Sequence, residues 1–203
     1  MRHAHPSLFV PPLALLGACA LIATAEVPAD ARAASDSAAA QAVPAHWVKK
    51  KIYFVYQGFT AHYSCEGLRD DIRLALLQLG ARRSDMNVRE LGCTTGLGVP
   101  NAAPGVTGTF SVLEPAADSQ APSAEAVKAR WVAVRVQLNP APSFGGDCEL
   151  IDQIKQKIIP LVTARNVKFT ENCIPHQLQP PGSQLQAEVL MPVGVKPVSP
   201  AGN

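Results

Sequence analysis

The stretch at residues 63–68, Tyr-Ser-Cys-Glu-Gly-Leu, has a counterpart at residues 147–151, Asp-Cys-Glu-Leu-Ile. An arginine follows the cysteine at the same distance in both copies, Arg82 in the first and Arg165 in the second. The pair Asn-Val and a basic residue then precede another cysteine in both copies. Several matches in the same order, at a nearly constant offset, predict the duplication of a unit of about 80 residues.

Each unit is predicted to run strand, helix, strand, strand. Apolar residues alternate with other residues over 52–56 and again over 131–138, which is the period of a strand. Apolar residues recur at helical spacing over 68–79 and over 151–161. Two short strands and two longer ones are then predicted at 88–91 and 167–169, and at 110–115 and 187–192.

The residues at the predicted helix ends suit those positions. Ser64 and Asp147 each stand directly before a cysteine and are good N-caps. Gly80 suits the end of the first helix, and Pro160 should end or kink the second. The adjacent acids at residues 70–71 are placed on the polar side of the first helix, so the sequence predicts no pair of catalytic carboxylates.

Two such units predict an α+β fold, in which duplicated βαββ units form a ferredoxin-like sheet with two helices on one face and extra strands. The domain is expected to span residues 47–192, with a first unit at 47–115 and a second at 129–192. Two separate small βαββ domains are the alternative. Residues 193–203 are expected to form a flexible tail.

The beginning of the chain predicts export. Residues 8–25 carry no charge and follow a weakly positive start, which is typical of a signal peptide over residues 1–25. An Ala-rich linker is expected at 26–46. Two processing routes remain open, cleavage after Ala25 or lipidation of Cys19 in a lipobox-like context. The mature protein is therefore expected to be periplasmic or secreted, and anchored in the envelope by a lipid if Cys19 is modified.

Export changes how the cysteines are interpreted. Without Cys19, four remain, and an even number in an oxidising compartment indicates disulfide bonds. In a strand–helix–parallel strand unit, the helix begins at the end of the sheet where the second strand finishes. This topology predicts that Cys65 pairs with Cys93 and that Cys148 pairs with Cys173.

Several chemistries are disfavoured by the composition and the motifs. A net charge of +2 gives no electrostatic reason to expect a nucleic-acid partner. Neither a Cys-x-x-Cys motif nor a paired-His motif is present, so no metal site and no cofactor are predicted. Ser64 is interpreted as a helix cap rather than a nucleophile. Glu66 and Glu149 fall in first helical turns, where the helix dipole favours acids.

Aromatic and histidine residues are expected to gather at the disulfide end. Such a surface could bind a peptide, a glycan or another envelope protein. The alternative is that these rings cover the disulfides and close the core. Because the charges nearly cancel, the contacts are expected to be aromatic rather than ionic. The candidate surface consists of Phe59, His62, Tyr63, Phe144 and His176.

The two cysteine motifs, together with Leu-Gly-Ala-Arg at residues 79–82 and Cys-Ile-Pro-His-Gln at residues 173–177, resemble those of a group of small exported Gram-negative bacterial proteins. The resemblance covers roughly residues 50–192. It implies an envelope location, and it assigns no catalytic residue.

The sequence thus predicts an exported cell-envelope protein that acts as a non-enzymatic interaction or accessory module. The alternative is an envelope hydrolase, or a carrier of a small ligand or metal, whose site the sequence does not reveal.

Overall fold

The computed structural model describes residues 42–58, 63–92, 103–116, 126–138, 147–170 and 183–198. Each half of the chain follows the predicted order of strand, helix, strand, strand. The first strand begins at Val43, inside the stretch expected to be a linker. The elements are β1 (Val43–Val55), α2 (Cys65–Gln78), β2 (Asn87–Leu91), β3 (Gly105–Pro115), β4 (Val127–Val136), α3 (Asp147–Lys157), β5 (Ala164–Thr170) and β6 (Gln184–Pro192), with short 3-10 turns η1 (Arg83–Asp85) and η2 (Ile159–Leu161).

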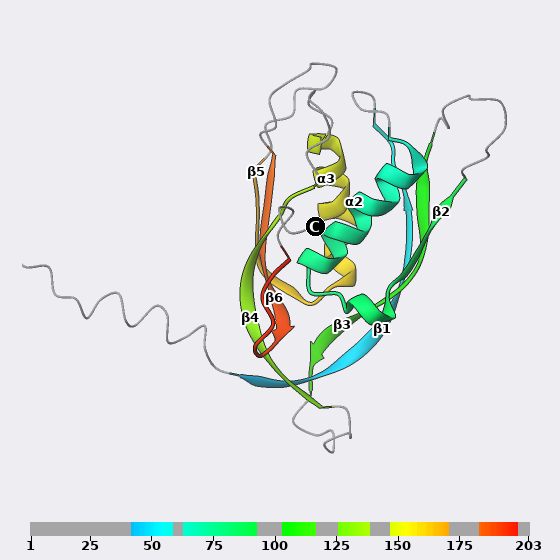
Figure 1. Ribbon diagram of the computed structural model, residues 1–203. Helices are drawn as coiled ribbons and strands as arrows, with labels where there is room; N and C mark the ends of the chain where they lie inside the picture. The colour runs from blue at the N-terminus through cyan, green and yellow to red at the C-terminus, as the bar shows by residue number, and fades with distance from the viewer. Residues whose placement is uncertain are drawn as a thin grey trace, which may run out of the picture.

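The strands form one sheet in the order β2-β3-β1-β4-β6-β5, with antiparallel pairing throughout. In each half the last strand lies between the first two, so β1 and β2 run in the same direction, as do β4 and β5. The halves join where residues 43–45 of β1 pair with residues 127–129 of β4. Beyond this short pairing β1 and β4 diverge (Figure 1). The chain is therefore α+β, with one six-stranded antiparallel sheet and two helices.

Both helices pack on the same side of the sheet and share one core (Figure 1). Alternate residues of each strand face this core, for example Ile52 and Phe54 on β1 and Leu185 on β6. The helices contribute Leu68, Ile72 and Leu76 from α2 and Leu150, Ile154 and Ile158 from α3. Neither helix in the described part of the chain has the length and apolarity needed to cross a membrane.

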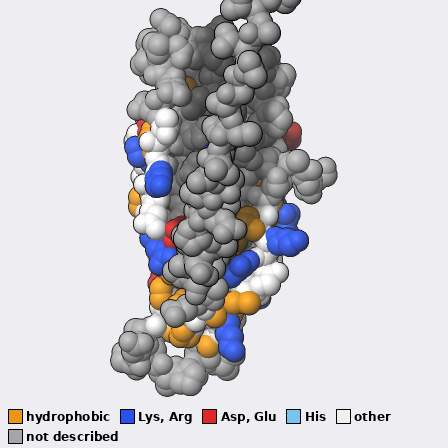
Figure 2. All heavy atoms as spheres, turned by 90° about the vertical axis from the view of Figure 1, so that its left-hand side faces the viewer, with side chains coloured by type: hydrophobic (Ala, Val, Ile, Leu, Met, Phe, Trp, Pro, Cys, Tyr) orange, Lys and Arg blue, Asp and Glu red, His pale blue; other side chains and the backbone are white. Residues whose placement is uncertain are grey.

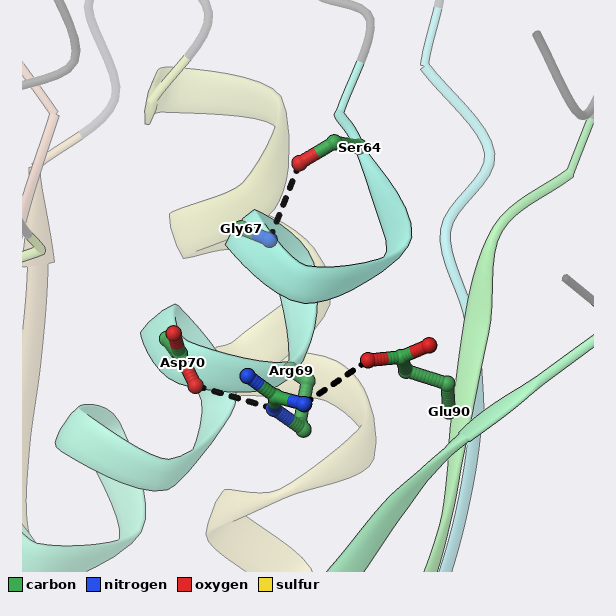
Figure 3. A network of polar contacts seen from close by, with 5 residues as sticks. All are labelled: Ser64, Gly67, Arg69, Asp70 and Glu90. Atoms are coloured by element: carbon green, nitrogen blue, oxygen red, sulfur yellow. Dashed lines mark hydrogen bonds and ion pairs between the residues drawn. The ribbon is translucent and has the colours of Figure 1, made fainter. Parts of the chain in front are cut away.

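The helix ends follow the sequence prediction closely. Ser64 caps α2, because its Oγ accepts a hydrogen bond from the backbone N–H of Gly67 at 3.0 Å (Figure 3). Gly80 follows the end of α2 with φ +88°, a left-handed conformation that suits glycine. The second helix ends at Lys157, and Pro160 lies in the 3-10 turn that follows. Asp147 begins α3, and its side chain lies outside the described residues.

One placement on α2 is corrected by the structure. Asp70 is solvent-exposed and pairs with Arg69 at 2.9 Å, as expected for the polar side of the helix. Asp71 is only 6% exposed, so it does not lie on that side. The reason is helical geometry, because Asp71 stands three residues after Leu68 and four before Ala75 and so flanks the apolar stripe.

Two buried glutamines connect the halves where β1 and β4 no longer pair. The Gln78 side chain on α2 donates to the carbonyl oxygen of Gln137 and accepts from its N–H, both at 2.8 Å. The Gln153 side chain on α3 does the same for the backbone of Gln57, at 2.8 and 3.1 Å. Each glutamine therefore hydrogen-bonds the backbone N–H and carbonyl of a residue in the other half, just after the end of that half's first strand.

Candidate functional site

The surface predicted from the sequence falls mainly outside the described residues. Tyr63 is the exception among its five members. The cysteine pairings also involve residues beyond the described ranges. The residues in question are Phe59, His62, Phe144 and His176 of the predicted surface, together with Cys19, Cys93 and Cys173.

The described part of this end brings the starts of the two helices together. Cys65 begins α2 and Cys148 is the second residue of α3, and both helices start at the same end of the molecule (Figure 1). Tyr56 connects them. Its ring meets the Tyr63 ring edge-on with centroids 4.9 Å apart, and its hydroxyl donates to Glu149 Oε2 at 3.1 Å. Tyr63 packs half-buried against the main core, so it contributes to closing that core.

The polar residues of the first turns of α2 also have structural partners. The Ser64 hydroxyl oxygen is engaged as the helix cap. Arg69 pairs with Glu90 of β2 at 2.8 Å as well as with Asp70, and so ties α2 to the edge of the sheet (Figure 3). Helix capping thus accounts for Ser64, and docking of the helix onto β2 accounts for Arg69.

The opposite side of the sheet, which neither described helix covers, is called the outer face here. Its strand residues alternate with those that face the core. Tyr53 of β1 is 71% exposed there. Figure 2 views the left-hand side of Figure 1 and shows Lys and Arg side chains along it, with hydrophobic side chains at its lower end. The exposed basic residues on the strands of the outer face are Lys49, Lys51, Arg89, Arg135, Arg165 and Lys168, and Glu188 is the acidic strand residue among them.

Two arginines stack on two tryptophans of this face. The Arg82 guanidinium lies 5.3 Å from the Trp47 ring centroid, and that of Arg165 lies 4.2 Å from the Trp131 ring centroid. Such contacts combine cation–π attraction with the covering of apolar surface. Both tryptophans pack against a small second apolar cluster that includes Leu113 and Leu190. The arginines recognised in the sequence repeat thus occupy matching places in the two halves.

A shallow groove with a volume of about 650 Å³ crosses β4, β6 and β5 on the outer face. Lys168, Gln186 and Arg135 form one row across the three strands, because Gln186 pairs with each of the other two. Arg165, Glu188 and Ala133 form the next row. The described lining consists of Ala133, Val134, Arg135, Asn166, Val167, Lys168, Gln186, Ala187 and Glu188.

Hydrogen bonds and nearby charges hold the ionised side chains of the groove in place. Asn166 lies at an irregularity in the pairing of β5 with β6 and has φ +51°. The hydrogen bonds from the side chains of Asn166 and Arg165 hold the pKa of the Glu188 carboxyl below its usual range, and the charges of Arg165 and Lys168 act in the same direction. Glu188 is therefore ionised and engaged, while Arg135 and Lys168 leave positive charge in the groove.

The amino-acid sequence shows only part of this site. The alternation of Val residues with Trp131, Ala133 and Arg135 shows that these three share the polar side of one strand. The pattern could not show that Lys168 and Gln186 lie beside them. No group of His, Cys, Asp and Glu residues suited to hold a metal ion occurs within the described ranges. No family model, no curated protein and no solved structure matches the chain.

Proposed function

We propose that this chain is an exported, non-enzymatic interaction module of the cell envelope, which binds its partner through the outer face of its sheet. The observation that carries the proposal is the uneven distribution of charge. The whole chain has a net charge of only +2, but basic side chains gather on the side of the sheet that no described helix covers. An open face with fixed positive charge and exposed aromatic surface is suited to recognition. Ionic contacts with the partner therefore have a larger part in this proposal than in the expectation from the sequence, which favoured aromatic contacts.

The non-enzymatic reading is supported by what the reactive side chains do. The Ser64 hydroxyl oxygen is the acceptor of a helix cap, and Glu149 accepts the Tyr56 hydroxyl. These two groups at the starts of the helices are thus engaged in local structural contacts.

The proposal includes the envelope location, with an export signal over residues 1–25 that is either cleaved after Ala25 or lipidated at Cys19. It also includes the pairing of Cys65 with Cys93 and of Cys148 with Cys173. In support, neither Cys65 nor Cys148 is a free thiol. The backbone also favours the first pairing, because Leu91 at the end of β2 and Val55 at the end of β1 both pair with Gly105.

We also propose that the halves arose by duplication of a βαββ unit. The order β2-β3-β1 in one half and β5-β6-β4 in the other is the same arrangement, and it matches the split βαβ of ferredoxin-like folds. The matching Arg82–Trp47 and Arg165–Trp131 contacts support this history.

The function is tested by affinity capture from native envelopes with the tagged full chain. The variant Lys51→Glu/Arg135→Glu reverses two charges of the outer face, and Arg73→Glu, on the exposed side of α2, is the matched control. Partners should be lost from the first variant and kept by the second. Equal capture by both variants would refute binding through the outer face. Mass spectrometry of the exported protein separates a start at residue 26 from a diacylglyceryl adduct on Cys19.

A further inference from the structure

We infer that the groove across β4, β6 and β5 binds an acidic glycan, a chain of sugars that carries carboxylate groups. The inference rests on the proposed function and specifies the ligand class and the place on the outer face. It is carried by the juxtaposition of Arg135, Lys168 and Gln186 over the floor formed at Ala133.

The charge of the groove is complementary to that of an acidic ligand. Lys168 and Arg135 flank Gln186 on neighbouring strands, so their backbones are about 10 Å apart at the usual strand spacing. Glu188 pairs with Arg165 at 2.6 Å and also lies near Lys168, so the two flanking cations Arg135 and Lys168 leave the groove with a net positive charge. Two cations at the two sides of one groove suit a ligand with repeated negative groups, and an arginine can bind a carboxylate through two parallel hydrogen bonds.

The hydrogen-bonding groups of the lining suit a chain of sugars. Gln186 and Asn166 supply amide donors and acceptors, and Glu188 supplies acceptors. Sugar hydroxyls both donate and accept, so they match such a mixed lining. The described lining residues carry no aromatic ring on which a nucleic-acid base could stack, and its aliphatic residues form no deep apolar slot for an acyl chain. The groove also crosses the face of the sheet, whereas an added peptide strand would lie along its edge.

The two halves of the chain differ at the floor of the groove. Trp47 pairs with Leu113 as Trp131 pairs with Leu190, which sets the correspondence between β1 and β4. By this correspondence Lys49 of the first half stands where Ala133 stands in the second. The small Ala133 side chain leaves the floor of the groove open, and a lysine at the same place would fill it.

This difference supplies a sharp test. The variant Ala133→Lys adds a positive charge but fills the groove, and Lys49 shows that this sheet accepts lysine at the corresponding place. Binding of an oligomannuronate hexasaccharide to the purified exported protein is measured by calorimetry, with neutral cellohexaose as the reference sugar. We expect the wild type to bind the uronate and not the neutral sugar. Ala133→Lys should weaken uronate binding at least tenfold, Arg135→Ala at least fivefold, and Lys49→Ala less than twofold.

Stronger uronate binding by Ala133→Lys would contradict binding in the groove, because it would show that diffuse positive charge attracts the ligand. Equal affinity for polyphosphate or oligo-dT would overturn the assignment to a glycan. A second variant, Gln186→Ala, guards against misfolding of the first and should weaken uronate binding at unchanged melting temperature. If no uronate binds while the capture experiment still depends on Lys51 and Arg135, the ligand class is wrong and the interaction module stands.

Discussion

Single residues in this protein act mainly through the backbone they meet. Gly80 ends α2 with φ +88°, and a Cβ at this position would lie 2.9 Å from the carbonyl oxygen of Leu190 on β6. Gly194 has a similar φ of +90°, but a Cβ there would meet nothing within 4 Å. The two glycines therefore separate the cost of a left-handed conformation from the cost of close packing.

We expect Gly80→Ala to lower the free energy of unfolding by about 2–3 kcal/mol and Gly194→Ala by about 1 kcal/mol, because only the first adds a clash to the backbone strain. Urea denaturation at equal m-values measures both. Equal losses for the two variants would mean that α2 and β6 can move apart at no cost.

Glu188 should make stability depend on pH. Its pKa is lowered in the folded state by the hydrogen bonds from Asn166 and Arg165, so its contribution is present above the pKa of the unfolded chain. This contribution is lost as the pH falls through the lower, folded pKa. Wild type should therefore lose more stability on acidification than Glu188→Gln, as measured by urea denaturation across acidic pH. Parallel pH profiles for the two proteins would contradict the assigned hydrogen bonds.

At the scale of the elements, the glutamines on the helices take the place of a strand ladder. β1 and β4 pair only over residues 43–45 and 127–129, which leaves the backbone beyond each strand end to find other partners. Gln78, at 2% exposure, and Gln153, at 9%, supply them from opposite halves. The helices thus fill the space between the diverging strands and also hold the two strand ends.

We expect Gln78→Leu and Gln153→Leu each to cost about 1–3 kcal/mol, because each removes both partners of a part-buried backbone N–H and carbonyl. Gln156→Leu on the exposed side of α3 is the control and should stay within about 0.5 kcal/mol. Hydrogen exchange at the amide of Gln137 should quicken in Gln78→Leu and not in the control. Unchanged exchange at that amide would show that another group satisfies it.

On the scale of the whole molecule, the strands of both halves form one sheet that curves around the two helices. Basic side chains lie on the outer face of this sheet. The proposed disulfides would fasten each helix start to the strand that returns to the same end of the sheet. Each would close a loop of fewer than about thirty residues, worth roughly 3–4 kcal/mol in the chain-entropy model.

Peptide mapping under non-reducing conditions should therefore recover Cys65 linked to Cys93 and Cys148 linked to Cys173. Reduction should lower the melting temperature of the exported protein, while a variant lacking Cys19 should keep both links. A peptide that joins Cys93 to Cys148 would contradict both pairings.

The amino-acid sequence by itself determined the order of strands and helices and the cap of the first helix, whereas the first strand begins earlier than predicted, at Val43. Alternation over 52–56, the apolar stripe over 68–79 and the cap at Ser64 are local patterns, because they depend on the periods of strand and helix and on neighbouring backbone groups. The same periodicities indicated the strand–helix–strand–strand order of both halves. Asp71 shows the limit of such patterns, because a residue at the flank of an apolar stripe can be buried or exposed depending on what packs beside it.

Only the tertiary structure decided which polar residues meet. Arg135, Lys168 and Gln186 come from three strands, and they become neighbours because β6 inserts between β4 and β5 in a definite register. The same holds for Arg82 over Trp47 and for Gln153 at Gln57. Hydrophobic periodicity indicates which side of a strand is buried, but strand order and register set what lies beside it, since they arise from packing between segments far apart in the chain.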